Sequence, residues 1–98
     1  MAKKKFSIVF SPAAQKDIAA LETAEAIQLT RDIASCLEIN PFPFGETRIK
    51  KLTGYKPSLY RLRSGDFRAC YRILPGTVVI LAVTKRKDSA KLFKKLKP

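Results

Sequence analysis

The sequence contains no histidine, and only 8 of its 98 residues are Asp or Glu. The missing histidine removes the most common general base and metal ligand, together with every Ser-His or Cys-His nucleophilic pair. The few carboxylates show no paired or metal-ligand spacing, so we expect no metal and no cofactor. Any catalysis by this chain would depend on arginine, lysine, tyrosine and backbone groups.

Cysteines and long apolar segments are also scarce. Cys36 and Cys70 lie far apart without Cys-x-x-Cys spacing, which favours two small buried hydrophobic residues over a disulfide. The apolar stretch VVILAV, residues 78–83, is far shorter than a membrane span. The charged start MAKKKFSIVF lacks the apolar stretch of a signal peptide. We therefore expect a cytoplasmic protein that does not enter a membrane.

Positive charge, by contrast, is abundant. The chain has 20 Lys and Arg, which leaves a formal net charge of +12. A small domain this basic favours a polyanionic partner such as nucleic acid, a ribosome, an anionic membrane or an acidic protein. The alternative is a basic surface with no partner. The length allows a single domain, residues 1–98, around one core.

The first forty residues predict a strand followed by two helices. Phe6, Ile8 and Phe10 alternate with smaller residues, which is typical of a strand. Ser11 and Pro12 form a helix start, and apolar residues recur at helical spacing over residues 12–21. A second apolar stripe continues until Asn40-Pro41 ends it, so we expect an αα-hairpin that packs on a sheet.

The second half of the chain changes to a period of two. Residues 59–63 and 67–73 flank Ser64-Gly65-Asp66 and predict a hairpin, and residues 78–83 predict a central strand. A basic helix begins near Asp88. The predicted fold class is therefore α+β, with a small, largely antiparallel sheet of about four strands packed against the N-terminal αα-hairpin. The expected order is β-α-α-β-β-β with a short C-terminal helix.

Alternation within the hairpin places arginines on one face of the sheet. If the apolar residues face the helices, four arginines stand together on the exposed side, namely Arg61, Arg63, Arg68 and Arg72. Like charges on paired strands cost stability, so this arrangement indicates an anionic ligand that neutralises them. The alternative is a solvated face that serves solubility.

The motifs KKLTG, YRLRSGDFRACYRI, VVILAV and TKRKDSAKLF, in this order of elements, resemble the RelE/ParE superfamily of bacterial type II toxin–antitoxin toxins. The resemblance covers nearly the whole chain. RelE-branch members are ribosome-dependent mRNA endoribonucleases, whereas ParE-branch members act on DNA gyrase. We expect the RelE-like activity, with 2′-hydroxyl attack giving a 2′,3′-cyclic phosphate and a free 5′-hydroxyl.

The resemblance implies roles for particular residues. The expected catalytic residues are Arg61, Arg63, Arg68, Arg86 and Lys85, and the expected RNA-binding residues are Lys50, Lys51, Arg72 and Lys87. A guanidinium suits this task because it holds two phosphate oxygens and gains strength as charge builds on them.

The chain departs from the family at two positions. Thr84-Lys85-Arg86 replaces glycine-histidine-arginine, and Leu92 or Phe93 stands where many relatives have a catalytic tyrosine. The proton-transfer group would then be Lys85, Lys87 or Tyr71, although Tyr71 falls on the predicted core face.

The resemblance also implies partners, and two other functions stay open. An acidic antitoxin, the ribosome and mRNA are the expected partners. A ParE-like gyrase inhibitor would need no nuclease site. A non-catalytic RNA-binding module would explain the charge, but the predicted exposed face lacks stacking aromatics.

Overall fold

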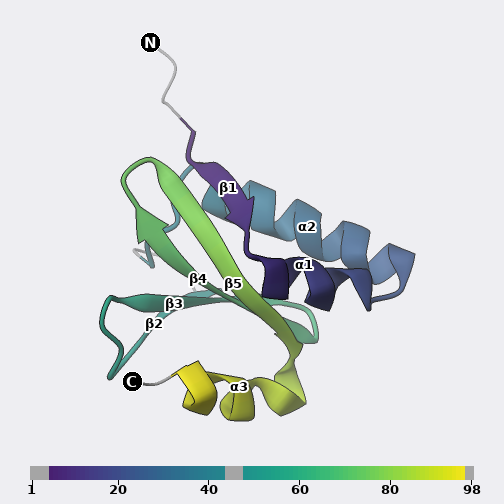
Figure 1. Cartoon of the computed structure of the whole chain (residues 1–98). Coiled ribbons are helices and arrows are strands. Elements are labelled where there is room, and N and C mark those ends of the chain that lie inside the picture. Colours follow the sequence, from purple (N-terminus) through teal and green to yellow (C-terminus); the bar gives the residue numbers. More distant parts are fainter. Residues whose placement is uncertain (1–4, 44–47, 97–98) are drawn as a thin grey trace.

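The computed structural model describes residues 5–43 and 48–96, which form one sheet with helices on both faces (Figure 1). The elements follow the chain in the order β-α-α-β-β-β-β-α. Their bounds are β1 Ser7–Phe10, α1 Pro12–Ala19, α2 Thr23–Leu37, β2 Ile49–Leu52, β3 Leu59–Ser64, β4 Phe67–Leu74, β5 Thr77–Lys85 and α3 Ser89–Leu96, with a short 3₁₀ turn over Arg86–Asp88 before α3.

The sheet has five strands in the order β1-β5-β4-β3-β2. β2 to β5 pair antiparallel as a meander, while β1 returns to pair parallel with β5. The expectation of an α+β fold with a largely antiparallel sheet is therefore confirmed. The sheet has one strand more than expected, because residues 49–52 pair with β3 although their hydrophobic pattern is too short and irregular to indicate a strand.

α1 and α2 cover one face of the sheet and enclose the larger part of the core. Ser11 caps α1 by accepting a hydrogen bond from the N–H of Ala14 at 3.1 Å, and Pro12 occupies the first turn. Leu29, Ile33 and Leu37 of α2 are buried against the sheet, as their spacing predicts. α1 ends at Ala19, two residues before the expected boundary.

The opposite face of the sheet carries a second, smaller core beneath α3. Leu92 and Phe93 pack on a cluster formed by Leu59, Cys70 and Ala82. The hydroxyl of Tyr55 donates a hydrogen bond to the carbonyl oxygen of Phe93, which fixes the helix to the loop before β3. α3 crosses this face near the C-terminal end of the chain (Figure 1). The expectation that this face is open to solvent is therefore wrong over its central part.

The cysteines lie in separate elements and are both free thiols. Cys70 is fully buried in the sheet and Cys36 is half-buried on α2. The expected burial is therefore confirmed for Cys70 only. None of the helices within residues 5–43 and 48–96 is long and apolar enough to span a membrane.

Candidate functional site

The β3–β4 hairpin brings the predicted arginines together on the α3 side of the sheet. Arg63 pairs with Arg68 across the hairpin, and Arg61 pairs with Cys70, so these side chains leave the sheet on the same face. Arg86 follows β5, the other neighbour of β4. The charges of Arg61, Arg86 and Arg63 all act on Arg68 and contribute to lowering its pKa, after the larger effect of burial. We call these four residues the arginine cluster.

Arg68 lies at the centre of the arginine cluster and is almost fully buried. Its side chain and backbone together are 7% exposed. Its Nη1 donates to the carbonyl oxygens of Gly65 at 3.0 Å and Phe67 at 2.9 Å. The negative charge of the Asp66 carboxylate acts in the opposite direction and raises the pKa of Arg68. The burial lowers the pKa because it disfavours the charged guanidinium, which nevertheless remains protonated at neutral pH, as arginine does in proteins.

Arg61 has hydrogen-bonding capacity that the protein leaves unused. Its Nε is buried and has no hydrogen-bond partner in the described part of the chain. A buried N–H without a partner costs about 1–3 kcal/mol. Such a group recovers this free energy when an acceptor reaches it, so Arg61 is suited to binding an anion.

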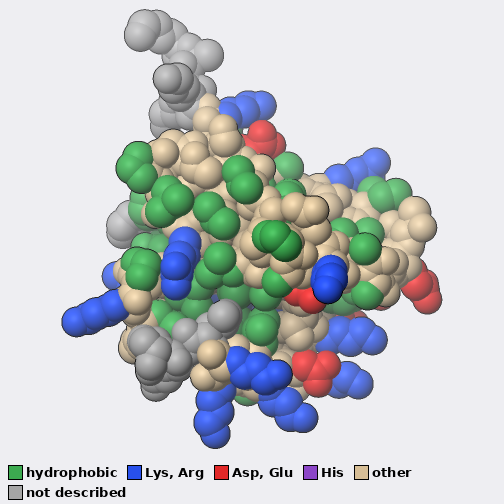
Figure 2. Space-filling view, viewed as in Figure 1, with side chains coloured by type: hydrophobic (Ala, Val, Ile, Leu, Met, Phe, Trp, Pro, Cys, Tyr) green, Lys and Arg blue, Asp and Glu red, His purple; other side chains and the backbone are tan. Residues whose placement is uncertain are grey.

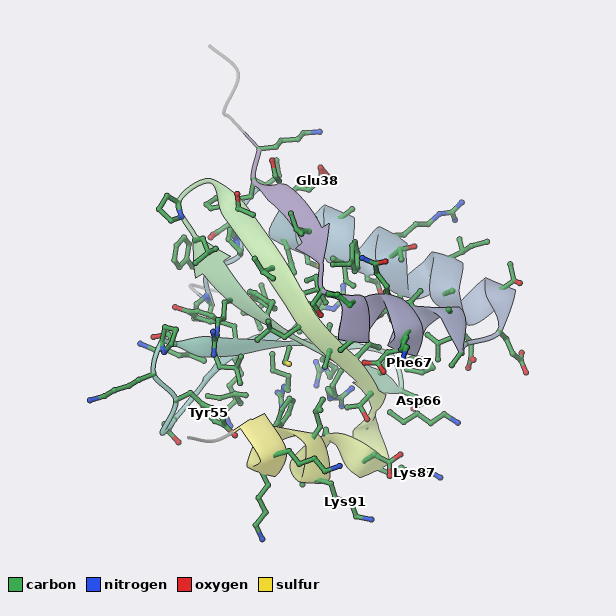
Figure 3. All side chains as sticks on the ribbon, viewed as in Figure 1. Glu38, Tyr55, Asp66, Phe67, Lys87 and Lys91 are labelled. Atoms are coloured by element: carbon green, nitrogen blue, oxygen red, sulfur yellow. The ribbon has the colours of Figure 1, made fainter. Side chains whose placement is uncertain are left out.

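The turn between β3 and β4 holds Arg86 beside the other arginines. Gly65 and Asp66 form a two-residue loop, and Gly65 has a φ of +57°, which an L side chain rarely adopts. The carbonyl oxygen of Asp66 accepts a hydrogen bond from the N–H of Arg86 at 2.7 Å. Asp66, Phe67 and Lys87 lie close together where β5 leads into α3 (Figure 3), and all three line one hollow.

The end of β5 is also held by α1. β5 extends beyond its pairing with β1, which ends at Phe10 opposite Ile80. There the carboxylate of Asp17 accepts a hydrogen bond from the N–H of Val83 at 2.9 Å, and the hydroxyl of Ser11 donates to the carbonyl oxygen of Leu81 at 2.8 Å. Two side chains of the α1 segment therefore replace the missing strand and fix the direction in which the chain leaves toward Arg86.

Arg48, a residue that the sequence did not indicate, holds the backbone of Arg63 in place. Arg48 forms two hydrogen bonds with Arg63. Its carbonyl oxygen accepts from the backbone N–H of Arg63 at 2.8 Å, and its side-chain Nε donates to the Arg63 carbonyl oxygen at 3.1 Å. Its guanidinium also forms an ion pair with Asp32 at 3.0 Å. The Asp32 carboxylate accepts from Ser64 and Gln28 as well, so α2 is joined to the end of β3.

Of the other predicted residues, Arg72 and Lys50 lie on the face of the arginine cluster by strand register. Arg72 is two residues beyond Cys70 on β4, and Lys50 stands opposite Arg61 on β2. Lys51 stands opposite Tyr60 and Lys85 opposite Phe67, which places both on the face that α1 and α2 cover. Arg72 lies four residues further along β4 than Arg68 and pairs with Val79 of β5. The exposed Lys87 belongs to the 3₁₀ turn.

The residues considered for proton transfer differ in their surroundings. Tyr71 is fully buried, and burial raises its pKa, so it does not reach the arginine cluster as a base. Leu92 and Phe93 pack on the sheet and carry no titratable group. Lys85 and Lys87 are exposed on either side of Arg86. No group of three or more His, Cys, Asp or Glu side chains that could hold a metal ion occurs in residues 5–43 and 48–96.

The wider surface around α3 is basic. Figure 2 shows Lys and Arg side chains gathered over α3 and the end of β5, whereas hydrophobic side chains are more frequent over the sheet. α3 itself carries exposed Lys91, Lys94 and Lys95. The arginine cluster and this surface together can hold a phosphate-rich ligand through charge-assisted hydrogen bonds.

Comparison with known proteins identifies the family. The family model for the ParE toxin of type II toxin–antitoxin systems, parDE, matches residues 8–90. The chain therefore belongs to this family and is a type II toxin–antitoxin toxin of the RelE/ParE superfamily. None of the curated proteins compared with the sequence matches it.

Solved structures share the fold over most of the chain. The toxin–antitoxin complex RelBE2 from Mycobacterium tuberculosis matches with a TM-score of 0.72 and 24% identity, covering 89% of this chain and 98% of that chain. The archaeal RelE–RelB complex from Pyrococcus horikoshii OT3 matches with a TM-score of 0.67 and 25% identity, covering 83% and 94%. The intact E. coli RelBE complex matches with a TM-score of 0.65 and 26% identity, covering 82% and 95%.

Proposed function

We propose that this toxin is a RelE-like, ribosome-dependent mRNA endoribonuclease that inhibits translation. The observation that carries the proposal is the arginine cluster, in which Arg61, Arg63 and Arg86 surround the buried Arg68 on one face of the sheet. Repulsion among four cations on neighbouring positions destabilises the free protein, and a phosphate placed among them relieves it. The RelE structures that share the fold support the same reading.

In the proposed reaction the 2′-oxygen of a ribose attacks the adjacent phosphorus. The bond from phosphorus to the 5′-oxygen of the next nucleotide breaks, so the products are a 2′,3′-cyclic phosphate and a 5′-hydroxyl. Arg61 and Arg86 would bind the non-bridging oxygens, where charge builds up as the new bond forms. Arg63, exposed at the rim, would hold the neighbouring backbone phosphate, with Lys50 extending this surface along β2.

The proton-transfer steps fall to lysines in this proposal. The 2′-hydroxyl must lose a proton and the departing 5′-oxygen must gain one. Lys85 and Lys87 flank Arg86 and are exposed. Lys85 lies by register on the other face of the sheet, opposite Phe67, so Lys87 in the 3₁₀ turn is the first candidate and Lys85 the second.

The proposed partners are an acidic antitoxin, the ribosome and mRNA, in the cytoplasm, with residues 1–98 as one toxin domain. Three solved structures with this fold are complexes of a toxin with its antitoxin. A net charge of +12 favours an acidic chain that folds on contact with this surface.

A second candidate function is ParE-like inhibition of DNA gyrase. The matching family model is that of the ParE toxin, and this chain has Leu92 or Phe93 where many RelE relatives have a catalytic tyrosine. A gyrase inhibitor needs no proton-transfer group, so this departure from the RelE pattern would be neutral for it.

Two assays separate these functions. Purified toxin is added to a translation extract, in which mRNA cleavage is mapped, and to a gyrase supercoiling reaction. We expect cleavage in the first and no effect in the second. Arg61→Gln should abolish cleavage, whereas Arg31→Gln, the same charge change at an exposed position on α2, should not. Intact mRNA together with inhibited supercoiling would reject the nuclease and support the gyrase inhibitor.

A further inference from the structure

Arg68 uses its guanidinium differently from the other residues of the arginine cluster. Its Nη1 makes two hydrogen bonds to backbone carbonyls, those of Gly65 and Phe67, within its own hairpin. These two residues flank Asp66, so the guanidinium closes the turn from the inside. Fewer N–H groups are then free for a phosphate, and the 7% exposure of the residue leaves little access to one.

The same β3–β4 turn is also hydrogen-bonded to the backbone of Arg86. The carbonyl oxygen of Asp66 accepts the N–H of Arg86, and this bond lies just beyond the last β4–β5 pair, Phe67 with Lys85. The peptide of Asp66 therefore cannot rotate without moving the backbone of Arg86. Two short connections link the guanidinium of Arg68 to the backbone from which the Arg86 side chain extends.

We propose that Arg68 is a positioning residue and not a phosphate ligand: its guanidinium holds the turn at Gly65–Phe67, and the turn anchors Arg86 beside Arg61 and Arg63. The consequence for RNA rests on the proposed function, whereas the hydrogen bonds themselves exist without a ligand. Ligand binding then falls to Arg61, whose Nε is buried without a partner, and to the exposed Arg63 and Arg86.

The division of roles follows from the geometry of the guanidinium. The two N–H groups of Nη1 each donate to one carbonyl, and the planar guanidinium fixes their directions, whereas the ammonium of a lysine ends one bond short of the Nη1 position and rotates freely. Replacing Arg68 with lysine keeps the charge but weakens the two hydrogen bonds to the carbonyl oxygens of the turn. A residue that acts only through its charge would tolerate this change, whereas a residue that holds the turn would not.

The first experiment observes the side chains of the unaltered full chain. In ¹⁵N-labelled protein, the guanidinium signals of Arg61, Arg68 and Arg86 are followed during titration with a short single-stranded RNA that is 2′-O-methylated and therefore resists cleavage. We expect the Arg61 and Arg86 signals to shift and the Arg68 signals to stay in place, with couplings from Nη1 to the carbonyl carbons of Gly65 and Phe67. A shift of the Arg68 signals as large as that of Arg61 would overturn the proposal.

The second experiment measures amide hydrogen exchange of Arg86 in Arg68→Lys and Arg68→Gln. We expect exchange of the Arg86 amide to rise about tenfold or more in both, which corresponds to about 1.4 kcal/mol. The amide of Tyr71, in the middle of β4, should keep its protection. Unchanged exchange at Arg86 in a folded Arg68→Gln protein would contradict the proposal. If neither variant folds, the titration of the unaltered protein decides.

A double-mutant cycle for RNA affinity completes the test. If Arg68 acts through Arg86, then Arg68→Gln should weaken binding of the 2′-O-methylated RNA much less when Arg86→Gln is already present. Purely additive losses would show that Arg68 acts independently and would reject the proposal. If neither Arg61 nor Arg86 responds to RNA, the proposed function fails, while the Arg86 exchange still decides whether Arg68 holds the turn.

Discussion

The hydroxyl of Tyr71 donates a hydrogen bond to the carbonyl oxygen of Pro41 at 2.7 Å, so the central tyrosine of β4 is joined to the segment that follows α2. Both residues are fully buried. The ring of Tyr71 also stacks on that of Tyr60, with centroids 5.6 Å apart. This tyrosine stabilises the core between the sheet and the helices and does not belong to the arginine cluster on the other face.

Removing that hydroxyl should therefore affect stability and leave RNA binding unchanged. In Tyr71→Phe the Pro41 carbonyl loses its partner in a buried position, and we expect the free energy of unfolding to fall by about 1–3 kcal/mol. Urea denaturation measures the change. Tyr60→Phe, which alters the partly exposed member of the stacked pair, should cost less, and an equal loss in the two variants would refute a special role for the Tyr71 bond.

Asp32 should stabilise the protein in a pH-dependent way. Burial alone would raise the pKa of Asp32, but hydrogen bonds from Ser64, Arg48 and Gln28 and the charge of Arg48 outweigh it and lower the pKa below 3.8. A lowered carboxyl pKa contributes stability above the unfolded value, and this contribution disappears as the pH falls through the folded value.

Asp32→Ala should thus reduce the free energy of unfolding by about 1–3 kcal/mol at pH 7 and by less at pH 3, because the contribution declines once the pH falls below 3.8. Denaturant titrations at the two pH values measure this difference. Glu22→Ala serves as control, because Glu22 is exposed and makes no side-chain capping bond. A loss from Asp32→Ala that is equally large at both pH values would exclude the proposed ionic contribution.

Cys70 should make the protein less stable in alkali. Burial raises the pKa of the Cys70 thiol from 9.0 to about 11, because the thiolate is disfavoured in the core. The unfolded chain then loses its thiol proton first, so stability is full below pH 9 and falls between pH 9 and about 11.

Each pKa unit between the two states is worth about 1.4 kcal/mol, so this decline should amount to about 2–3 kcal/mol by pH 11. In Cys70→Ala the baseline stability should be lower, but this part of the pH dependence should be missing. Guanidinium denaturation from pH 7 to pH 11 tests the point, and parallel curves for the two proteins would show that the thiol does not contribute.

α3 should protect Cys70 from solvent. Phe93 packs on the cluster that contains Cys70, so Phe93→Ala should expose the thiol and increase its rate of reaction with an aromatic disulfide reagent. We expect an increase of about tenfold if opening of α3 becomes easier by about 1.4 kcal/mol. Lys94→Ala, at the exposed neighbouring position, is the matched control. A rate unaffected by Phe93→Ala would mean that α3 does not limit access.

Local patterns in the sequence determined most of the elements and the faces they bury. Ser11-Pro12 marked the start of α1, and the spacing of Leu29, Ile33 and Leu37 identified the buried face of α2, because a helix start and a helical stripe depend on neighbouring residues only. The period of two in the hairpin likewise placed Arg61 and Arg68 on one face of the sheet.

The tertiary structure decided what each arginine does, because burial and partners come from segments distant in the sequence. Alternation treated Arg68 and Arg63 alike, yet Arg68 is buried on the turn carbonyls and Arg63 is exposed. α3 covers part of the face that alternation alone left open, and Arg48 reaches Asp32 across 16 residues of chain. Period and propensity act over a few residues, whereas desolvation and hydrogen-bond pairing depend on the packing of the whole chain.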